Sequence, residues 1–489
     1  MQEASRSAPQ RGVADAATAA LRTRTPDVAD ADAGRCASWA GYVERMRSPT
    51  LTRQILGLAV PAFFALVAEP LFLLVDSAII GHLGTPQLAG LGVAGSVLAT
   101  AVGVFVFLAY GTTATVSRAL GAGAEERVVT AGVDGTALAL VLGVLAAAGV
   151  ALGAEPLCAA LGATGEVLQH AVVYLRVSAL GLPAMLVVLA ITGALRGVQD
   201  TRTPLVVSVV GFSLNAVLNL AFVYGLGWGI AGSAWGTVLA QLAMASALFA
   251  VWFRRLRASG SRLRLRPGGV LTAARDGAPL VVRTLALRAI LLLTVWVAAS
   301  LGEVTLAAYQ VTFAVWTLLT FALDALAIAG QALTGKGLGA ADVAGVRAAT
   351  ATMVRWGIVG GAGMGLLVAL SGPLVAPLFT PDARVQAAVI AALVVVGIGQ
   401  PVSGYVFVLD GVLIGAGDGR WLARGMILVL LGYLPVVALL RLNADALAAQ
   451  GPVVATVALW LGFTAFMLIR SAMLRWRERR DAWLVTGLV

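Results

Sequence analysis

The segment FALVAEPLFLLVDSAIIGHLG (residues 64–84) is apolar along almost all of its length, yet it contains two acidic residues. Glu69 and Asp76 are seven residues apart, which is two turns of an α-helix, so their side chains share one face. A run this long and this apolar predicts a helix that crosses a lipid bilayer. An ionised side chain at that depth is costly unless it faces a partner or a wet cavity. We therefore expect both acids to be functional.

The composition predicts an integral membrane protein with many spans. Of 489 residues, 60% are hydrophobic and 12% are charged, whereas soluble domains have about 25% charged residues. The net charge of +10 does not indicate a nucleic-acid partner, because most arginines lie in short loops between apolar runs. Cys36, Cys158, His82 and His170 are isolated from one another, so we expect no metal site, no cofactor and no disulfide framework.

Twelve apolar runs are long enough to be membrane spans. Their limits are 55–80, 88–116, 131–154, 170–193, 204–225, 230–253, 279–301, 306–334, 350–371, 386–413, 424–441 and 452–474. Basic residues are concentrated in the loops on one side of these spans, most densely between Arg254 and Arg275. By the positive-inside rule, we expect both termini in the cytoplasm and the chain in the cell (inner or plasma) membrane.

An internal repeat organises the chain. The motif SRALGAG from Ser117 recurs as GKGLGAA from Gly335, and GALRGVQDTR from Gly193 recurs as GVLIGAGDGR from Gly411. Both pairs are separated by 218 residues, as are LAGLGV at Leu88 and LAAYQV at residue 306. The repeat predicts an all-α integral membrane fold, with twelve transmembrane helices in two pseudo-symmetric six-helix lobes. Parallel repeats of this kind suit transport by alternating access.

The predicted organisation has five parts. They are a disordered cytoplasmic tail at 1–50, an N-lobe at 51–253, a basic cytoplasmic inter-lobe loop at 254–278, a C-lobe at 279–475 and a cytoplasmic tail at 476–489. The first part is either a tail of the native protein or a segment upstream of the true translation start.

The chain resembles the MATE (multidrug and toxic compound extrusion) family, and its DinF branch in particular. The resemblance rests on AEPLFLLVDSAIIGHLGTPQLAGLGVAGSV, YLRVSALGLPAMLV, GALRGVQDTRTPL, NLAFVYGLGWGIAGSAWGT, LDALAIAGQALTGKGLGA and FVLDGVLIGAGDGR, and it covers about 51 to 475. It implies an antiporter, not an enzyme, that exports amphipathic, cationic organic compounds in exchange for H⁺ or Na⁺. It also implies a functional acid at Asp76.

Asp76 is the predicted proton carrier. Desolvation disfavours the charged form of a buried carboxyl group, so Asp76 is placed to take up and release a proton. Asn215 and Asn219 share a face of the fifth span, and Thr237 lies on the sixth, so we expect these three beside it. The family often has an aspartate at the position of Asn219, so a two-carboxylate site is not expected here. The other reading of the two asparagines is polar contacts between packed helices.

Further charged residues are candidates for substrate binding or secondary coupling. Glu69 fits substrate contact, coupling and simple pairing equally well. In the second lobe, Asp324 and Asp410 lie within spans, and Arg288 should pair with one of them, with Asp324 the first choice. Asp410 could also take part in a sodium site. Thr294, which aligns with Asp76 through the repeat, is not acidic, and this favours protons over sodium.

The leading interpretation is a proton-coupled exporter of organic cations that works as a monomer in the bilayer. A sodium-coupled exporter and an exporter of organic anions such as citrate stay open as alternatives. A flippase for lipid-linked precursors would need several cationic residues lining its cavity, and the spans seem to hold few, chiefly Arg288. A membrane-embedded enzyme would need clustered His, Cys or paired acids. The exported compound itself cannot be identified from the sequence.

Overall fold

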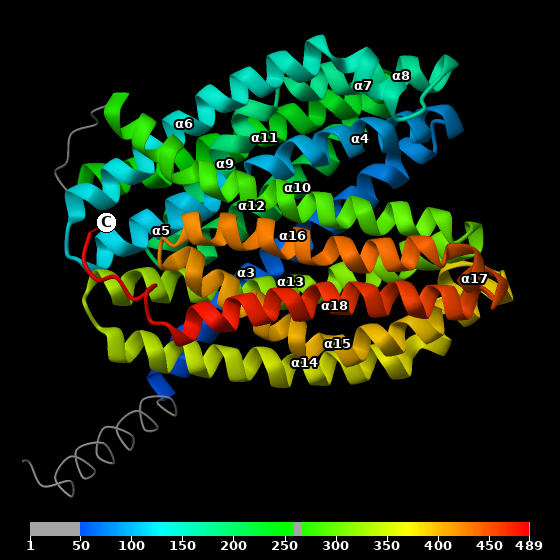
Figure 1. Ribbon diagram of the computed structural model, residues 1–489. Coiled ribbons are helices and arrows are strands. Elements are labelled where there is room, and N and C mark those ends of the chain that lie inside the picture. Colours follow the sequence, from blue (N-terminus) through cyan, green and yellow to red (C-terminus); the bar gives the residue numbers. More distant parts are fainter. Residues whose placement is uncertain (1–48, 259–266, 489) are drawn as a thin grey trace, which may run out of the picture. The chain divides into compact units, whose positions relative to one another are not determined.

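The computed structural model of the protein describes residues 49–258 and 267–488, and every regular element in these ranges is a helix. In chain order they are α3 (Pro49–Gly81), α4 (Thr85–Phe105), α5 (Phe107–Gly121), α6 (Glu125–Leu152), α7 (Ala154–Ala160), α8 (Gly165–Ala179), α9 (Leu182–Gly197), α10 (Arg202–Leu220), the π-helix η1 (Ala221–Gly225), α11 (Gly229–Ala258), α12 (Pro267–Ser300), α13 (Glu303–Gly339), α14 (Val343–Phe379), α15 (Ala383–Gly415), α16 (Gly419–Leu442), α17 (Ala444–Ala449) and α18 (Pro452–Arg479). Figure 1 shows their arrangement.

Twelve segments of the described chain are long and apolar enough to cross a membrane. Eleven are single spans, with α4 and α5 counted together, and the twelfth is the pair α8 and α9, which is bent by 51°. This agrees with the twelve apolar runs in the sequence and confirms the predicted all-α membrane fold. The fourth run, 170–193, is the bent pair.

The repeat extends to the helix boundaries. Helix α13 begins and ends 218 residues after the segment formed by α4 and α5, and α15 stands in the same relation to α8 and α9. Each of these C-lobe helices is continuous, whereas its N-lobe counterpart is broken. One break lies at Gly181, where a Cβ would come within 2.1 Å of the Gln241 Oε1 atom from α11. The position 218 residues after Gln241 is Leu459, so a polar side chain meets the break in one lobe only.

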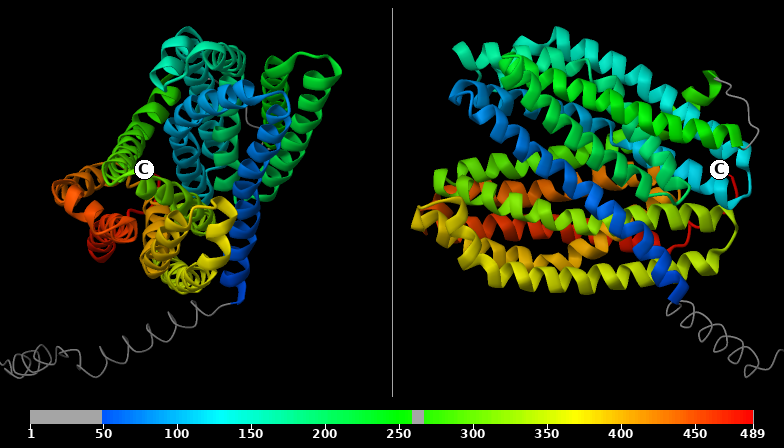
Figure 2. Two further views of the ribbon diagram at one scale, coloured as in Figure 1. Left: turned by 90° about the vertical axis from the view of Figure 1, so that its right-hand side faces the viewer. Right: turned by 180° about the vertical axis from the view of Figure 1, so that it is seen from behind.

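The first helix of each lobe also contacts the other lobe. Helix α3 packs against α10 of the N-lobe and α13 of the C-lobe, and α12 packs against α16 of the C-lobe and α6 of the N-lobe. In Figure 2, α3 (blue) runs obliquely past both groups of helices. Relative motion of the lobes therefore has to move or bend these two helices.

The lobes meet backbone to backbone at one end of the bundle. A Cβ at Gly121 on α5 would lie 1.9 Å from the Lys336 carbonyl oxygen, and a Cβ at Gly339 on α13 would lie 2.1 Å from the Arg118 carbonyl oxygen. Only glycine permits so close an approach. We call this contact between residues 117–121 and 335–339 the seam, and the end of the bundle where it lies the closed end.

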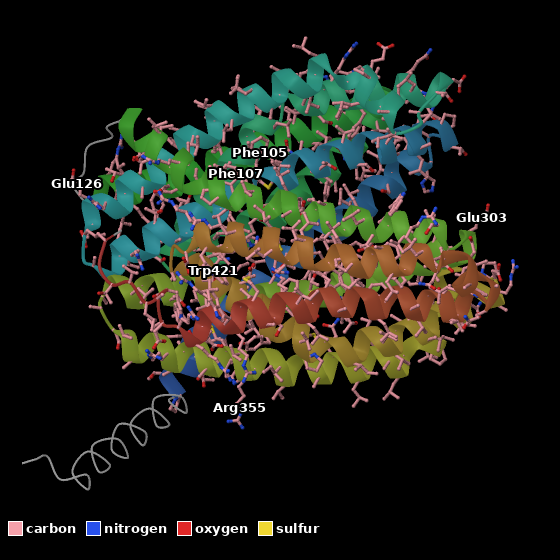
Figure 3. The ribbon with its side chains drawn as sticks, in the orientation of Figure 1. Phe105, Phe107, Glu126, Glu303, Arg355 and Trp421 are labelled. Atoms are coloured by element: carbon pink, nitrogen blue, oxygen red, sulfur yellow. The ribbon has the colours of Figure 1, made fainter. Side chains whose placement is uncertain are left out.

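Chain direction follows from the same landmarks. The labelled side chains of Glu126, at the start of α6, and Glu303, at the start of α13, lie at opposite ends of the bundle (Figure 3). Because α13 ends at the seam, it begins at the end remote from it, which we call the far end. Helix α3 begins at the closed end and finishes at the far end (Figures 1 and 2).

Parts of the expected loops and tails are helical or packed. Helix α11 continues to Ala258 and α12 begins at Pro267, so of the stretch 254–278 only 259–266 lies outside the described residues. Helix α18 continues to Arg479, and the following residues lie against the closed end, where Trp483 is buried. The tail predicted at the N-terminus lies outside the described residues, apart from its last two positions, which begin α3.

Candidate functional site

Asp76 is buried within the N-lobe and accepts hydrogen bonds from three helices. Its side chain is 2% exposed. The Oδ1 atom accepts from Asn219 Nδ2 of α10 at 2.7 Å and from Ser233 Oγ of α11 at 2.8 Å. The Oδ2 atom lies 3.3 Å from the Tyr174 hydroxyl of α8, which donates to it. All three donors are neutral, so no arginine or lysine neutralises this carboxylate.

A second pair of polar side chains lies one helical turn from this contact. Asn215 Nδ2 donates to Thr237 Oγ1 at 3.1 Å, so the sequence places all four predicted residues in one region, with Asn215 and Thr237 paired to each other. The Oδ1 atoms of Asn215 and Asn219 are both buried without a hydrogen-bond partner in the described part of the chain. The region, which we call the Asp76 cluster, therefore has unused acceptor oxygens.

Glycine on α11 makes room for this arrangement. A Cβ at Gly236 would lie 2.1 Å from Asn219 Oδ1, so any larger residue there would push the amide away from Asp76. Helix α3 also contains Pro61 and Pro70, each of which removes a backbone hydrogen bond and makes the helix easier to bend. Asp76 is therefore on a helix that is already weakened.

Two partners of Asp76 were not expected from the sequence. Ser233 and Tyr174 lie in apolar segments, and their only signal was that they are polar residues within spans. Such residues are frequent in membrane helices, so the signal does not single them out without the fold. Their coupling role, like that of Asp76, Asn215, Asn219 and Thr237, stays a prediction.

The C-lobe contains a buried acid with a different environment. Asp410 on α15 receives two hydrogen bonds from Arg283 of α12, one of them from Nε to Oδ1 at 3.3 Å and the other from Nη2 to Oδ2. Arg470 Nη2 of α18 lies 3.2 Å from the same Oδ2. The three side chains are 9% exposed or less, so this is a buried Arg–Asp–Arg triad.

Three further polar groups adjoin the triad from both lobes. Tyr110 of α5 and Arg196 of α9 come from the N-lobe, and Asp324 of α13 comes from the C-lobe. Tyr110 interacts electrostatically with Asp324, Arg283, Asp410 and Arg196, and Asp324 interacts with all three arginines. All three side chains are partly exposed. We call these six residues the inter-lobe charge cluster.

Two expectations about charged residues need correction. The predicted ion pair between Arg288 and Asp324 is not found among the described residues. Arg288 is exposed, with its guanidinium beside Gly103 of α4, and Arg283 is the α12 arginine that pairs with an acid. The expectation that the spans hold few cations is also wrong, because Arg283 and Arg470 are buried within spans.

Glu69 and Thr294 complete the set of predicted positions. Glu69 on α3 is exposed and makes no hydrogen bond or ion pair within residues 49–258 and 267–488, so simple pairing is not seen. Thr294, the repeat counterpart of Asp76, is fully buried, and its Oγ1 lies 3.0 Å from the Tyr433 hydroxyl. The C-lobe therefore has a neutral hydroxyl pair where the N-lobe has its acid.

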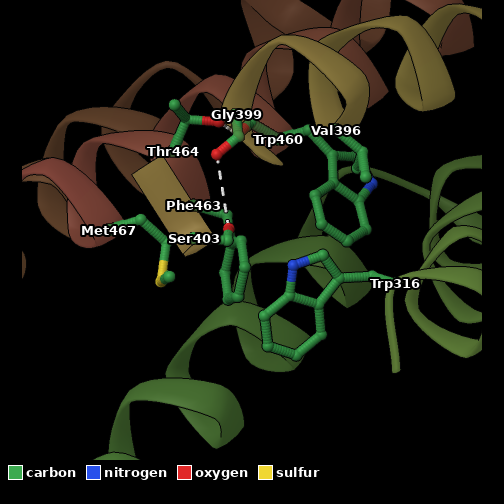
Figure 4. A pocket seen from close by; sticks show the side chains of 8 residues that line it. All are labelled: Trp316, Val396, Gly399, Ser403, Trp460, Phe463, Thr464 and Met467. Atoms are coloured by element: carbon green, nitrogen blue, oxygen red, sulfur yellow. Dashed lines mark hydrogen bonds between the residues drawn. The ribbon is translucent and has the colours of Figure 1, made fainter. Parts of the chain in front are cut away.

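A small aromatic pocket lies between α13, α15 and α18 (Figure 4). It is lined by Trp316, Val396, Gly399, Ser403, Trp460, Phe463, Thr464 and Met467. Ser403 Oγ donates to the Gly399 carbonyl oxygen at 3.3 Å, and no charged side chain lines the pocket. It therefore offers packing surface and no acid–base chemistry.

Comparison with known proteins identifies the family. The family model MatE matches residues 61–221 and 279–441, one match in each half of the repeat. The chain belongs to the MatE family. Proteins of this family are transporters, so the chain is a multi-pass membrane transporter and not an enzyme.

Curated MatE relatives include plant and bacterial proteins. The chain is 29% identical over 444 residues to Protein DETOXIFICATION 44, chloroplastic, of Arabidopsis thaliana, covering 88% of this chain and 83% of the relative. It is also 29% identical over 442 residues to DNA damage-inducible protein F of Escherichia coli, covering 87% and 92%. The second match agrees with the DinF branch expected from the sequence.

Solved MatE structures share the fold. A transporter of the MOP superfamily from Pyrococcus furiosus superposes with a TM-score of 0.78 at 22% identity, covering 90% of this chain and 98% of that one. A MATE crystal structure in a bent conformation gives a TM-score of 0.79 at 22% identity, with 91% and 98% coverage. At this level of identity the likeness establishes the fold.

Proposed function

We propose that the protein is a proton-coupled antiporter that exports small organic compounds across the cell membrane by alternating access. In this proposal the closed end faces the cytoplasm, both termini lie there, and the transporter works as a monomer in the bilayer. The lobes correspond to the sequence repeat, with bounds of 51–253 and 279–475.

The observation that carries the proposal is the neutral environment of Asp76. A buried carboxylate held only by an amide and two hydroxyl groups has no cation to keep it ionised. A group in that situation can exist in either protonation state, with the hydrogen bonds rearranged between them. Asp76 is therefore the group of the N-lobe best suited to carry a proton through a transport cycle.

Protonation of Asp76 would change the bend of α3. Neutralising the carboxylate weakens the charge-assisted hydrogen bonds from Asn219 and Ser233, which connect α3 to α10 and α11. Because α3 also packs against α13 of the C-lobe, a change in its course is transmitted to the contact between the lobes. Proton binding from the far side would in this way favour opening or closure of the seam.

A specific observation also keeps sodium as a second candidate ion. The unpartnered Oδ1 atoms of Asn215 and Asn219 lie near the Asp76 carboxylate, and hard cations bind oxygen ligands. A sodium ion there would be held by the acid and these amide oxygens. The proton and sodium alternatives make opposite predictions for a single experiment.

The experiment uses the full chain in vesicles of phosphatidylethanolamine and phosphatidylglycerol. A pH gradient and a sodium gradient are imposed separately, and movement of ethidium, an organic cation, and of radiolabelled tricarballylate, an organic anion, is followed. We expect the pH gradient to drive at least one probe and the sodium gradient to drive neither. Transport that follows only sodium would replace proton coupling with sodium coupling.

Two variants locate the coupling group. Asp76→Asn keeps the size of the side chain and removes the titratable oxygen, and we expect it to reduce gradient-driven transport to background. Thr294→Val removes the hydroxyl at the repeat-related position of the C-lobe, and we expect it to leave coupling unchanged. If Asp76→Asn folds and still responds fully to the pH gradient, Asp76 is not the proton carrier.

A further inference from the structure

The charge between the two lobes is not balanced. The inter-lobe charge cluster has three guanidinium groups, those of Arg196, Arg283 and Arg470, and two carboxyl groups, those of Asp324 and Asp410. With both acids ionised, one positive charge has no counter-charge in the cluster. With Asp324 protonated, two positive charges have none.

An unbalanced positive charge inside the bilayer is energetically unfavourable, and a bound anion would offset it. Arg470 is the member with the most unused hydrogen-bonding capacity. It is 4% exposed, its Nε atom has no hydrogen-bond partner among the described residues, and one side of its guanidinium faces the ring of Phe407 at 5.9 Å.

The cluster can be reached from the space between the lobes. Tyr110, Arg196 and Asp324 are partly exposed, whereas the triad behind them is buried. Tyr110 and Arg196 belong to one lobe and the triad to the other, so relative motion of the lobes changes access to the arginines. A compound carried by alternating access has to bind at such a boundary between the two lobes.

We infer that the inter-lobe charge cluster binds the carboxylate of the exported compound, which is therefore an organic anion. The inference rests on the proposed antiport function and names its substrate class. The planar guanidinium of arginine matches a carboxylate with two parallel hydrogen bonds. It also replaces the cationic compound favoured by the sequence, because a cation would meet an excess of like charge.

Arg470→Gln is the variant that tests this site without dismantling it. Asp410 keeps its two hydrogen bonds from Arg283 after the change, so the buried acid stays paired and the fold is retained. Arg470→Lys keeps the charge as a conservative control. Arg441→Gln is the matched control for loss of charge, because Arg441 lies at the far end of α16, near Trp296 and away from the cluster.

Two measurements are made on each variant. Uptake of radiolabelled tricarballylate into the vesicles described above gives KM, and stabilisation of the detergent-solubilised protein by tricarballylate against heat gives a binding readout that does not depend on coupling. We expect Arg470→Gln to raise KM by about tenfold, as for loss of one charged hydrogen bond, and to abolish the stabilisation. Arg470→Lys should lose less, and Arg441→Gln should resemble the wild type.

The outcomes separate this inference from the proposed function. If the pH gradient drives ethidium and tricarballylate neither moves nor stabilises the protein, antiport stands and the anion site is wrong. If tricarballylate stabilises the wild type but not Arg470→Gln while no gradient drives either probe, the anion site stands and proton antiport fails. Equal KM and equal stabilisation in wild type and Arg470→Gln would also overturn the anion site.

A separate observation concerns the C-terminal segment, residues 480–488, which contacts both lobes at the closed end. On the N-lobe side, Arg118 Nη2 of α5 donates to the Val485 carbonyl oxygen at 2.6 Å. On the C-lobe side, Gly487 N donates to the Leu338 carbonyl oxygen of α13 at 3.0 Å. Trp483 is 4% exposed and anchors the segment between these contacts.

We propose that this segment is a latch that holds the seam closed. Arg118 and Leu338 belong to the two strands of chain that form the seam, so the lobes cannot separate there while both hydrogen bonds persist. Opening the closed end requires release of the segment from one lobe. The latch therefore slows the step in which the seam opens.

The latch is tested by cysteine accessibility. Ala119→Cys, at a seam position that is 1% exposed, is labelled with a membrane-impermeant maleimide in a Cys36→Ser, Cys158→Ser background. We expect Arg118→Gln, or removal of residues 484–489, to speed labelling several-fold. Arg347→Gln is the control, because the Arg347–Asp481 ion pair is exposed and joins the segment to the C-lobe alone. Unchanged labelling in both latch variants would overturn the proposal.

Discussion

In the N-lobe Asp76 is held by three neutral donors, whereas in the C-lobe Asp410 is held by two arginines. The two acids also lie near opposite ends of the bundle. Each is five residues from the end of its helix, or about 8 Å along it, with Asp76 toward the far end and Asp410 toward the closed end. One lobe thus has an acid free to change its charge, and the other has an acid whose charge is fixed.

The repeat shows that this difference is built into the sequence. The positions equivalent to Asp410, Arg283 and Arg470 are Thr192, Ala65 and Trp252. The positions equivalent to Asp76 and Asn215 are Thr294 and Tyr433, which contact each other. Two copies of one helical plan have therefore been given complementary chemistry. A division of labour follows, in which the N-lobe handles the coupling ion and the charge cluster handles the substrate.

Removing the two acids should break the comparison most sharply. Asp410→Asn leaves two buried arginines without a carboxylate, and we expect a loss of stability of about 3–5 kcal/mol. Asp76→Asn leaves only neutral groups together, and we expect it to change stability far less. Thermal unfolding of both variants in detergent measures the difference. Equal effects on stability would show that the two acids are not held differently.

The double variant Asp410→Asn, Arg470→Gln provides the control. It removes the acid together with one of its arginines, so the buried excess charge is smaller than in Asp410→Asn alone. We expect it to be more stable than the single variant, because the two changes act on one ion network. A double variant that is less stable than Asp410→Asn would contradict this account.

The next effect in size is a packing change confined to the N-lobe. Gly236→Ala would place a Cβ 2.1 Å from Asn219 Oδ1, so the amide must move away from Asp76. We expect a cost of about 1–3 kcal/mol and weaker proton coupling. Gly149→Ala on α6 is the control, because nothing lies within 4 Å of the added Cβ. The position equivalent to Gly236 is Val454, so the C-lobe already tolerates a larger residue there.

Much of this architecture could be predicted from the sequence. Apolar runs predicted the twelve spans, and the constant offset predicted the two lobes, because both depend on composition and spacing alone. The contact of Asp76 with Asn219 was expected through the family resemblance. The choice between Arg283 and Arg288 was not accessible, since the two lie five residues apart and point about 140° away from each other on α12. Which one faces the triad depends on how the helix is rotated.

The smallest effect concerns the start of equivalent helices. Helix α14 has Asp342 as its N-cap, whose side chain accepts a hydrogen bond from Gly345 N at 2.9 Å, whereas the equivalent cap of α6 is Ala124, which has none. We expect Asp342→Ala to cost about 1 kcal/mol and Ala124→Asp to gain a comparable amount. Both changes are measured by thermal unfolding in detergent. Because the two helices begin in equivalent places, a gain from Ala124→Asp smaller than the loss from Asp342→Ala would show that Glu125 and Glu126 already stabilise the first turn of α6 through the helix dipole.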